Sequence, residues 1–491
     1  MTAAWTLISA FVGALLVLLL PARSAGLSRV IALVASLVGA VAAGAACWAR
    51  LQHPSAAVWS LDRAWIPSLG VRFHLAADGL SLTLLLLTGI VAVAGVLFSW
   101  NVEERPRAFF AFFLTIIGGV YGVFLSRDAF LLFAFYEIVI LPKYMLISIW
   151  GSTNREYGAM KLTMYSIGSS ALVLVGLLVA YAASGGTSFD IAHLATTSYP
   201  ASLQAWAFPI LFVGFAVLAG MWPFHTWAPT GHVAAPTAAS MLLAGVVMKL
   251  GAFGALCVAM PLFPQGFELW KPVIAGLAVV GVVYGALAAL AQRDLKFVIG
   301  YSSVSHMGFV LLGLAAGTHW GLRGAVLQMI SHGVIAGLLF GIAGRVVYER
   351  THTRDMMELQ GFNLRRALPG AAIAFTLATA ASMGVPGFSG FVAEISVVIG
   401  LWPQFPWLVP LIGIGIIITG AFSLRALHKA FFPAANSSAF TALPPLTWPE
   451  FSAITLLLVV SLAIGIYPQP WMALIDDGLR SPVFHSILSK P

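Results

Sequence analysis

The sequence predicts an all-α integral membrane protein with about fourteen transmembrane helices. Hydrophobic residues make up 60% of the 491 residues and charged residues only 9%, whereas soluble domains are about 45–50% apolar and about 25% charged. Apolar runs long enough to cross a bilayer, roughly 20 residues each, follow one another along the whole chain. We therefore expect one polytopic membrane domain over residues 1–491.

The first three runs form an N-terminal region, residues 1–107. The first run, MTAAWTLISAFVGALLVLLL, resembles a signal peptide, but it lacks a basic start, and Arg23 and Arg29 come after it. We expect it to be retained as a helix. Residues 432–491 hold the fourteenth run and a tail. The predicted spans are 3–20, 27–48, 77–99, 108–124, 128–149, 159–183, 205–228, 236–260, 271–291, 296–316, 321–346, 367–400, 404–431 and 451–468.

Proline and glycine interrupt the seventh and the twelfth span. The seventh contains MWPFHTWAP (221–229) and the twelfth contains MGVPGFSGF (383–391). Such breaks survive in a membrane where the freed backbone groups face protein or a water-filled cavity. The breaks are five spans apart, so residues 108–260 (helices 4–8) and 271–431 (helices 9–13) are predicted repeats. Five is odd, so the second repeat is inverted. Paired interruptions indicate an ion site; two unrelated proline kinks are the alternative.

The distribution of Lys and Arg predicts the orientation. If the N-terminus lies outside, fifteen of the 25 basic residues fall on inner loops and helix ends and eight on the outside. This bias favours both termini on the outer face. The formal net charge of +8 therefore reflects membrane topology rather than binding of nucleic acid.

Several other functions are excluded by the residues themselves. The two cysteines, Cys47 and Cys257, each lie inside an apolar run. Two isolated thiols form neither an iron–sulfur nor a zinc site. The sequence contains no GxGxxG, GxxxxGK[ST] or HExxH motif, so we expect the chain to bind no nucleotide and no catalytic zinc.

Four charged residues fall well inside predicted spans: Glu137, Lys143, Lys249 and Glu394. Each costs about 2.5–3.5 kcal/mol at a helix centre exposed to lipid. We therefore expect them to face the protein interior, to pair or to meet water. A structural ion pair is the alternative for Glu137 and Lys249, and snorkelling of the side chain to the interface is the alternative for Lys143.

Three histidines extend this line of polar side chains. His225 lies at the first break, and His306 and His332 lie near the middle of the tenth and eleventh spans. Histidine titrates near neutral pH and can pass a proton in either direction; a satisfied core histidine is the alternative. A buried lysine whose partner acid moves would switch between a loaded and an unloaded state. These residues form a hypothetical proton path.

Five long motifs carry a resemblance to a known family. They are FYEIVILPKYMLISIWG, PFHTWAPTGHVAAPTAASMLLAGVVMKLGAFG, QRDLKFVIGYSSVSHMGFVLLG, QMISHGVIAGLLFGIAGRVVYERTHTRDM and ASMGVPGFSGFVAEISVVIG. Together they resemble the M subunit (chain 4) family of the proton-pumping NADH:quinone oxidoreductase, respiratory complex I, over about residues 75–470.

The resemblance implies a bacterial inner-membrane subunit that contacts the lipid bilayer, translocates protons and lies between two similar antiporter-like subunits of the membrane arm. It also implies no cofactor in this chain, with NADH, FMN, iron–sulfur clusters and quinone in partner subunits. Glu137 matches the glutamate of a Glu–Lys pair, Lys249 the central lysine and Glu394 the distal glutamate. His306 and His332 resemble residues of the hydrophilic axis.

One departure from the family pattern concerns the Glu–Lys pair. The family usually has a lysine seven residues before the histidine of PFHTW, and here that position is Leu218. We hypothesise that Lys143 supplies the missing charge, although six residues along a straight helix do not align it with Glu137. A subunit of a cation/proton antiporter, of an energy-converting hydrogenase or of an inorganic-carbon uptake complex is the alternative function.

Overall fold

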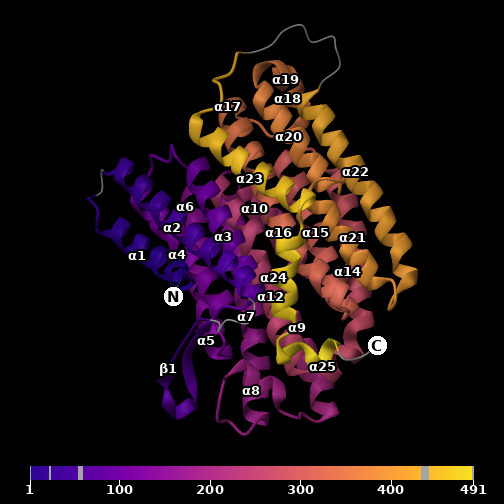
Figure 1. Cartoon of the computed structure of the whole chain (residues 1–491). Helices are drawn as coiled ribbons and strands as arrows, with labels where there is room; N and C mark the ends of the chain where they lie inside the picture. The colour runs from indigo at the N-terminus through magenta and orange to yellow at the C-terminus, as the bar shows by residue number, and fades with distance from the viewer. Residues whose placement is uncertain (1, 22–23, 54–58, 433–441, 489–491) are drawn as a thin grey trace.

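The computed structural model describes residues 2–21, 24–53, 59–432 and 442–488. The helices form an elongated bundle (Figure 1). A hairpin of β1 (Ser60–Ile66) and β2 (Val71–Ala76) lies at one end together with α8 (Ile191–Thr196) and α25 (His485–Leu488). The short helices α17 (Glu349–Thr351), α18 (Met356–Leu359) and α19 (Leu364–Ala367) lie at the other. We call these the β1 end and the α18 end.

The N-terminal helices differ in how much of their surface faces lipid. α3 is almost entirely buried, whereas α2 keeps most of its surface at the outside of the bundle. The Asp78 carboxylate starts α3 by accepting a hydrogen bond from the Ser81 N–H at 2.8 Å, as N-caps do. The helices are α1 (Ala4–Leu19), α2 (Ala25–Gln52) and α3 (Gly79–Phe98).

The first repeat contains three spans with interrupted hydrogen bonding. The seventh span is broken between α9 (Ala201–Leu218) and α10 (Trp227–Ala234), as predicted from MWPFHTWAP. α5 and α6 form one span that is interrupted at Val139, because Pro142 has no N–H to donate to the carbonyl of Ile138. The eighth span, here called helix eight, contains two π-helical segments. The elements are α4 (Pro106–Leu125), α5 (Ala129–Ile138), α6 (Ile140–Trp150), α7 (Arg155–Ala183), α9 (Ala201–Leu218), α10 (Trp227–Ala234) and, in helix eight, α11 (Thr237–Leu242), η3 (Leu243–Val247), α12 (Met248–Gly254), η4 (Ala255–Ala259) and α13 (Met260–Leu262).

The second repeat has the same order of long, long, long, broken and long helices. Its broken helix is α20 followed by α21, separated by the predicted glycine-rich segment. The elements of the second repeat and the C-terminal region are α14 (Pro264–Ala291), α15 (Leu295–Ala316), α16 (His319–Phe340), η5 (Gly341–Tyr348), α20 (Pro369–Ser382), α21 (Ser389–Leu401), α22 (Val409–Phe431), α23 (Trp448–Ile466), α24 (Gln469–Leu479) and η8 (Pro482–Phe484).

Matching backbone bridges show that the repeats are inverted. Asp128 starts α5 and pairs with Asp190, and Asp294 starts α15 and pairs with Asp355. α5 and α15 are each the second helix of their repeat. The first bridge joins the α8 segment at the β1 end, and the second joins the α18 segment at the opposite end (Figure 1). The helical class, the inversion and both breaks are therefore confirmed.

The number of spans agrees less closely with the sequence prediction. Among the described residues, twelve helices are long and apolar enough to cross a membrane. The first span, α1, and the two halves of the broken twelfth span, α20 and α21, are shorter apolar helices. The total of fourteen stays a prediction. The domain boundaries 1–107, 108–260, 271–431 and 432–491 also stay predictions, and part of the last range lies outside the described residues.

Candidate functional site

Lys249 lies at the centre of the bundle on helix eight, between the two π-helical segments. Its side chain is 0% exposed. The ammonium Nζ donates a hydrogen bond to the Ala244 carbonyl in η3 and another to His332 Nδ1, at 2.6 Å. A π-turn leaves carbonyls available that an α-helix would use, and such turns often occur at functional sites. Within the part of the chain that the structure describes, no carboxylate lies within 4.0 Å of the Lys249 ammonium.

The two histidines continue from this lysine. The rings of His332 on α16 and His306 on α15 are 5.7 Å apart between centroids. Gln328 Nε2 donates to His306 Nδ1 at 3.2 Å, and His306 Nε2 lies 3.1 Å from the Ser382 hydroxyl. Both contacts fit a neutral imidazole with its proton on Nε2. Among the described residues, His332 Nε2 has no hydrogen-bond partner; because Nδ1 accepts from Lys249, Nε2 carries the proton of the neutral ring and is free to donate it.

Glu394 on α21 ends the series. Its carboxylate Oε1 is 3.7 Å from His306 Nδ1, and the side chain is 6% exposed. The break in the twelfth span creates the space for this carboxylate. Gly384 has φ +69°, and a Cβ there would lie 2.6 Å from Glu394 Oε2. The glycine-rich interruption predicted from MGVPGFSGF therefore brings Ser382 and Glu394 to the same histidine.

The structure thus brings together four of the seven predicted residues: Lys249, His332, His306 and Glu394. We call these four the central row. They come from helix eight, α16, α15 and α21, and they form a line of exchangeable protons through an apolar core.

Glu137 and Lys143 do not join the central row. The Lys143 ammonium is buried and donates to the Ser166 hydroxyl on α7 at 3.2 Å. Glu137 Oε1 is buried without a hydrogen-bond partner. The two residues form no ion pair within 4 Å, although their charges interact at longer range. Lys143 also lines a small void with Leu243 and Val247 of helix eight.

His225 lies apart from these residues, at the break of the seventh span. It is buried, neither ring nitrogen has a hydrogen-bond partner, and the ring packs against Tyr284 at 5.1 Å between centroids. Leu218, where the family pattern has a lysine, ends α9 as a buried apolar side chain.

Two polar residues near the α18 end were missed by the sequence reasoning. His232 is 0% exposed with both ring nitrogens unpartnered, and it interacts electrostatically with Lys249 and Lys296. Lys296 Nζ donates to the Ala235 carbonyl at 2.9 Å, although the sequence placed Lys296 among the inner loop charges. His232 lies in the PFHTWAPTGHVAAP motif and Lys296 in QRDLKF. Both residues therefore belong to the motifs that carry the family resemblance, and this was the signal that could have found them.

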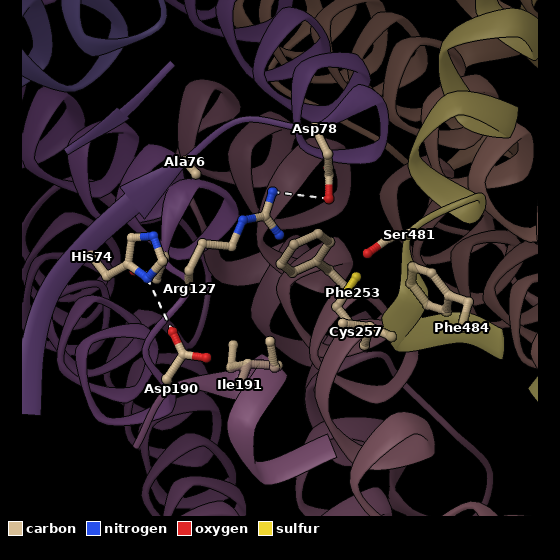
Figure 2. Close-up of a pocket in the computed structure, with 13 residues that line it drawn as sticks. His74, Ala76, Asp78, Arg127, Asp190, Ile191, Phe253, Cys257, Ser481 and Phe484 are labelled. Atoms are coloured by element: carbon tan, nitrogen blue, oxygen red, sulfur yellow. Dashed lines mark hydrogen bonds and ion pairs between the residues drawn. The ribbon is translucent and has the colours of Figure 1, made fainter. Parts of the chain in front are cut away.

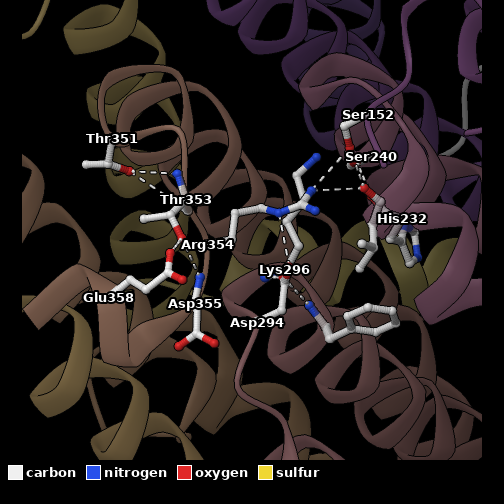
Figure 3. A network of polar contacts seen from close by, with 12 residues as sticks. Ser152, His232, Ser240, Asp294, Lys296, Thr351, Thr353, Arg354, Asp355 and Glu358 are labelled. Carbon is white, nitrogen blue, oxygen red and sulfur yellow. Dashed lines mark hydrogen bonds and ion pairs between the residues drawn. The ribbon is translucent and has the colours of Figure 1, made fainter. Parts of the chain in front are cut away.

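These two residues lie within a larger polar network. Figure 3 shows Arg354 reaching from the α18 segment across to Ser152, near Lys296 and Ser240. Arg354 Nε pairs with Asp294 at 3.1 Å, and Arg354 Nη1 donates to the Ser152 hydroxyl at 3.2 Å. The network thus joins the Asp294–Asp355 bridge to Lys296 through the Lys296 N–H, and it reaches His232 through that residue's backbone carbonyl, which accepts from Ser240.

Comparison with known proteins identifies the family. Residues 126–419 match the family described as "NADH:quinone oxidoreductase/Mrp antiporter, TM". The chain belongs to this family. Subunit M of the NADH-quinone oxidoreductase of Escherichia coli (strain K12) is 39% identical over 421 residues, which are 83% of this chain and 82% of that protein.

Two further relatives agree with this family membership. Chain 4 1 of the NAD(P)H-quinone oxidoreductase of Synechococcus sp. (strain JA-3-3Ab) is 40% identical over 415 residues, 83% of this chain and 78% of that protein. A chain of respiratory complex I from Thermus thermophilus superposes with a TM-score of 0.88 at 26% identity, covering 99% of this chain and 100% of that one. The resemblance to the subunit M (chain 4) family is confirmed.

Among the described residues, no group of three or more His, Cys, Asp or Glu side chains could hold a metal ion.

Proposed function

We propose that this chain is a proton-translocating, antiporter-like membrane subunit of an NADH:quinone oxidoreductase. The observation that carries the proposal is the central row, in which hydrogen bonds and close contacts connect Lys249 to Glu394 through two histidines. Electron transfer through NADH, FMN, iron–sulfur clusters and quinone takes place in partner subunits. The neighbours in the membrane arm include two similar antiporter-like subunits.

Protons enter from the α18 end in this proposal. The Arg354–Asp294 network, Lys296 and His232 lead inward to Lys249. Lys249 passes its proton to His332, and His306 relays it to Glu394. The chain lies in a bacterial inner membrane with both termini on the outer face, so the β1 end faces outward and the α18 end faces the cytoplasm.

The test is Lys249→Ala in the intact complex. Without the ammonium, His332 loses its donor, and we expect most of the proton pumping to be lost while the complex still assembles. The measurement is the pH change in inverted vesicles during NADH oxidation, together with the amount of assembled complex. Lys271→Ala is the matched control, because Lys271 pairs with Glu268 at 2.8 Å, away from the row. Unchanged pumping in Lys249→Ala would reject the proposal.

The alternative is a subunit of a cation/proton antiporter, which the same family includes. The two functions differ in the ion moved and in the energy source. Pumping that follows NADH oxidation and does not depend on sodium supports the oxidoreductase subunit. Exchange of sodium for protons in the absence of NADH supports the alternative.

A further inference from the structure

A cavity of about 290 Å³ lies at the β1 end, outside the central row. Its walls come from β2, the start of α3, the connection from α4 to α5, α8, helix eight and the C-terminal segment. Figure 2 shows two ion pairs on one side of this cavity, with Ser481 and Phe484 of the C-terminal segment on another. Segments from the whole length of the chain thus enclose one space.

The mouth of the cavity is charged and partly open. His74 Nδ1 lies 3.1 Å from Asp190 Oδ2, and Arg127 Nη2 lies 2.9 Å from Asp78 Oδ2. These four side chains keep 22–23% of their surface exposed. Polar groups in a space of this size hold water. The cavity is therefore a water-accessible vestibule, and its outer wall is lined by polar, titratable side chains.

The inner wall of the vestibule is helix eight itself. Phe253 and Cys257, one turn apart on the same helical face, line the cavity. Lys249 precedes Phe253 by one more turn, which is about 6 Å along the helix axis. The Phe253 ring packs edge to face on Phe124 of α4 at 5.1 Å between centroids, and both rings are buried. Along helix eight, Phe253 therefore lies between Cys257, which lines the vestibule, and Lys249.

We propose that this vestibule is a second access path to Lys249, leading from the β1 face, and that Phe253 with Phe124 forms its hydrophobic gate. The inference rests on the proposed function, because it gives Lys249 an aqueous route to the side opposite the α18 network. A constriction lined by aromatic rings excludes water while it is closed and admits it when one ring moves aside. The π-helical segments that flank α12 loosen the helix on both sides of the gate.

The first experiment measures how far a membrane-impermeant cationic methanethiosulfonate reaches from each face of vesicles that contain the whole complex. The Cys47→Ser variant leaves Cys257 as the single thiol of this chain. A second variant, Ser481→Cys in a chain without the two native cysteines, is the positive control for access of the reagent to the mouth of the vestibule. We expect Cys257 to be labelled from the β1 face and not from the α18 face. If Ser481→Cys is labelled and Cys257 is not, the vestibule does not reach helix eight, and this result would contradict the proposed access path.

The second experiment tests the gate at Lys249→Cys in the chain without native cysteines. We expect no labelling from the β1 face while Phe253 is present, labelling in Phe253→Ala, and none in Leu250→Ala. Leu250 is the matched control, because it is a buried apolar neighbour on the same helix that does not line the cavity. Equal labelling with and without Phe253, or no labelling in Phe253→Ala, overturns the gate. The amount of assembled complex is measured for each variant.

These labelling results are independent of pumping. Loss of the proposed function would show as unchanged pumping in Lys249→Ala, whatever the reagent reaches. Failure of the vestibule would show as an unreactive Cys257 in a complex whose pumping still requires Lys249. The two failures are therefore distinguishable.

Discussion

At the scale of single residues, the least expected feature is a glutamate and a lysine on one interrupted span. Glu137 precedes the interruption at Val139 and Lys143 follows it. The Lys143 ammonium donates to the Ser166 hydroxyl, whereas Glu137 Oε1 has no hydrogen-bond partner among the described residues. We propose that Lys143 replaces the charge missing at Leu218, acting at longer range than a direct ion pair.

Lys143→Met tests this replacement. The substitution removes the charge and keeps a long apolar stem, so we expect most of the coupled pumping to be lost without loss of assembly. Adding Leu218→Lys should restore part of the pumping, because the charge returns to the position that relatives use. Pumping and assembled complex are measured in the single and the double variant. A single variant that pumps normally would show that Lys143 has only a packing role.

At the scale of elements, the two bridges between connecting segments and helix starts hold the inverted repeats at opposite ends. Asp190 Oδ1 accepts the His193 N–H at 3.1 Å and so caps α8, while Asp190 Oδ2 pairs with His74. Burial raises the pKa of Asp190, but hydrogen bonds from His74 and from backbone amides outweigh burial and hold the pKa below its usual value.

The expected pH effect follows from this lowered pKa. Because the folded pKa is below the unfolded one, the stabilisation is fully present above about pH 4 and is lost as the pH falls through the folded value. Asp190→Ala should cost about 0.5–2 kcal/mol from the lost cap and remove this acid-dependent step. Limited proteolysis of the β1 end against pH measures it.

Asp355→Ala is the matched control for Asp190→Ala. Asp355 Oδ1 accepts the Met357 N–H at 2.7 Å and caps the equivalent helix, α18. Its loss should loosen the α18 end and leave proteolysis of the β1 end unchanged. Equal effects of both variants at both ends would contradict the assignment of the bridges to separate ends.

At the scale of the whole molecule, the C-terminal region closes the bundle across both repeats. α23 packs against α3 and α16, and its start is fixed by a buried carboxylate. Glu450 is 1% exposed and binds Arg345 Nε at 2.9 Å and Arg350 Nη2 at 2.7 Å. These contacts join the segment that follows α16, the third helix of the second repeat, to α23, which returns along the bundle towards the vestibule.

Glu450→Ala should destabilise the folded chain strongly. Removing one partner of a buried ion pair costs about 3–5 kcal/mol, and here Glu450 is shared by two arginines. Arg345 keeps its ion pair with Glu349, and Arg350 keeps its hydrogen bonds to the Pro444 and Pro445 carbonyls. We expect a lower thermal unfolding temperature and less assembled complex. Glu358→Ala is the control, since Glu358 is exposed at the same end of the molecule. A Glu450→Ala complex as stable as the control would show that α23 is held by apolar packing alone.

The sequence alone determined the membrane class, the position of most of the apolar helices, both breaks and the four charges within the predicted spans. These are local properties, because lipid requires an apolar run of nearly fixed length and makes each charge within it costly. The sequence also contains an Arg–Asp pair directly before α5 and another before α15. Only the structure shows that Asp128 and Asp294 of these pairs form the backbone bridges to the connecting segments.

The tertiary structure alone decided which polar residues meet. Four helices from distant parts of the sequence place Lys249, His332, His306 and Glu394 in contact, while Glu137 and His225 lie apart and His232 and Lys296 lie inward of the α18 network. The vestibule beside Phe253 also exists only because six elements from distant parts of the sequence enclose it. Helix rotation and packing set these distances, and hydropathy along the chain does not encode them.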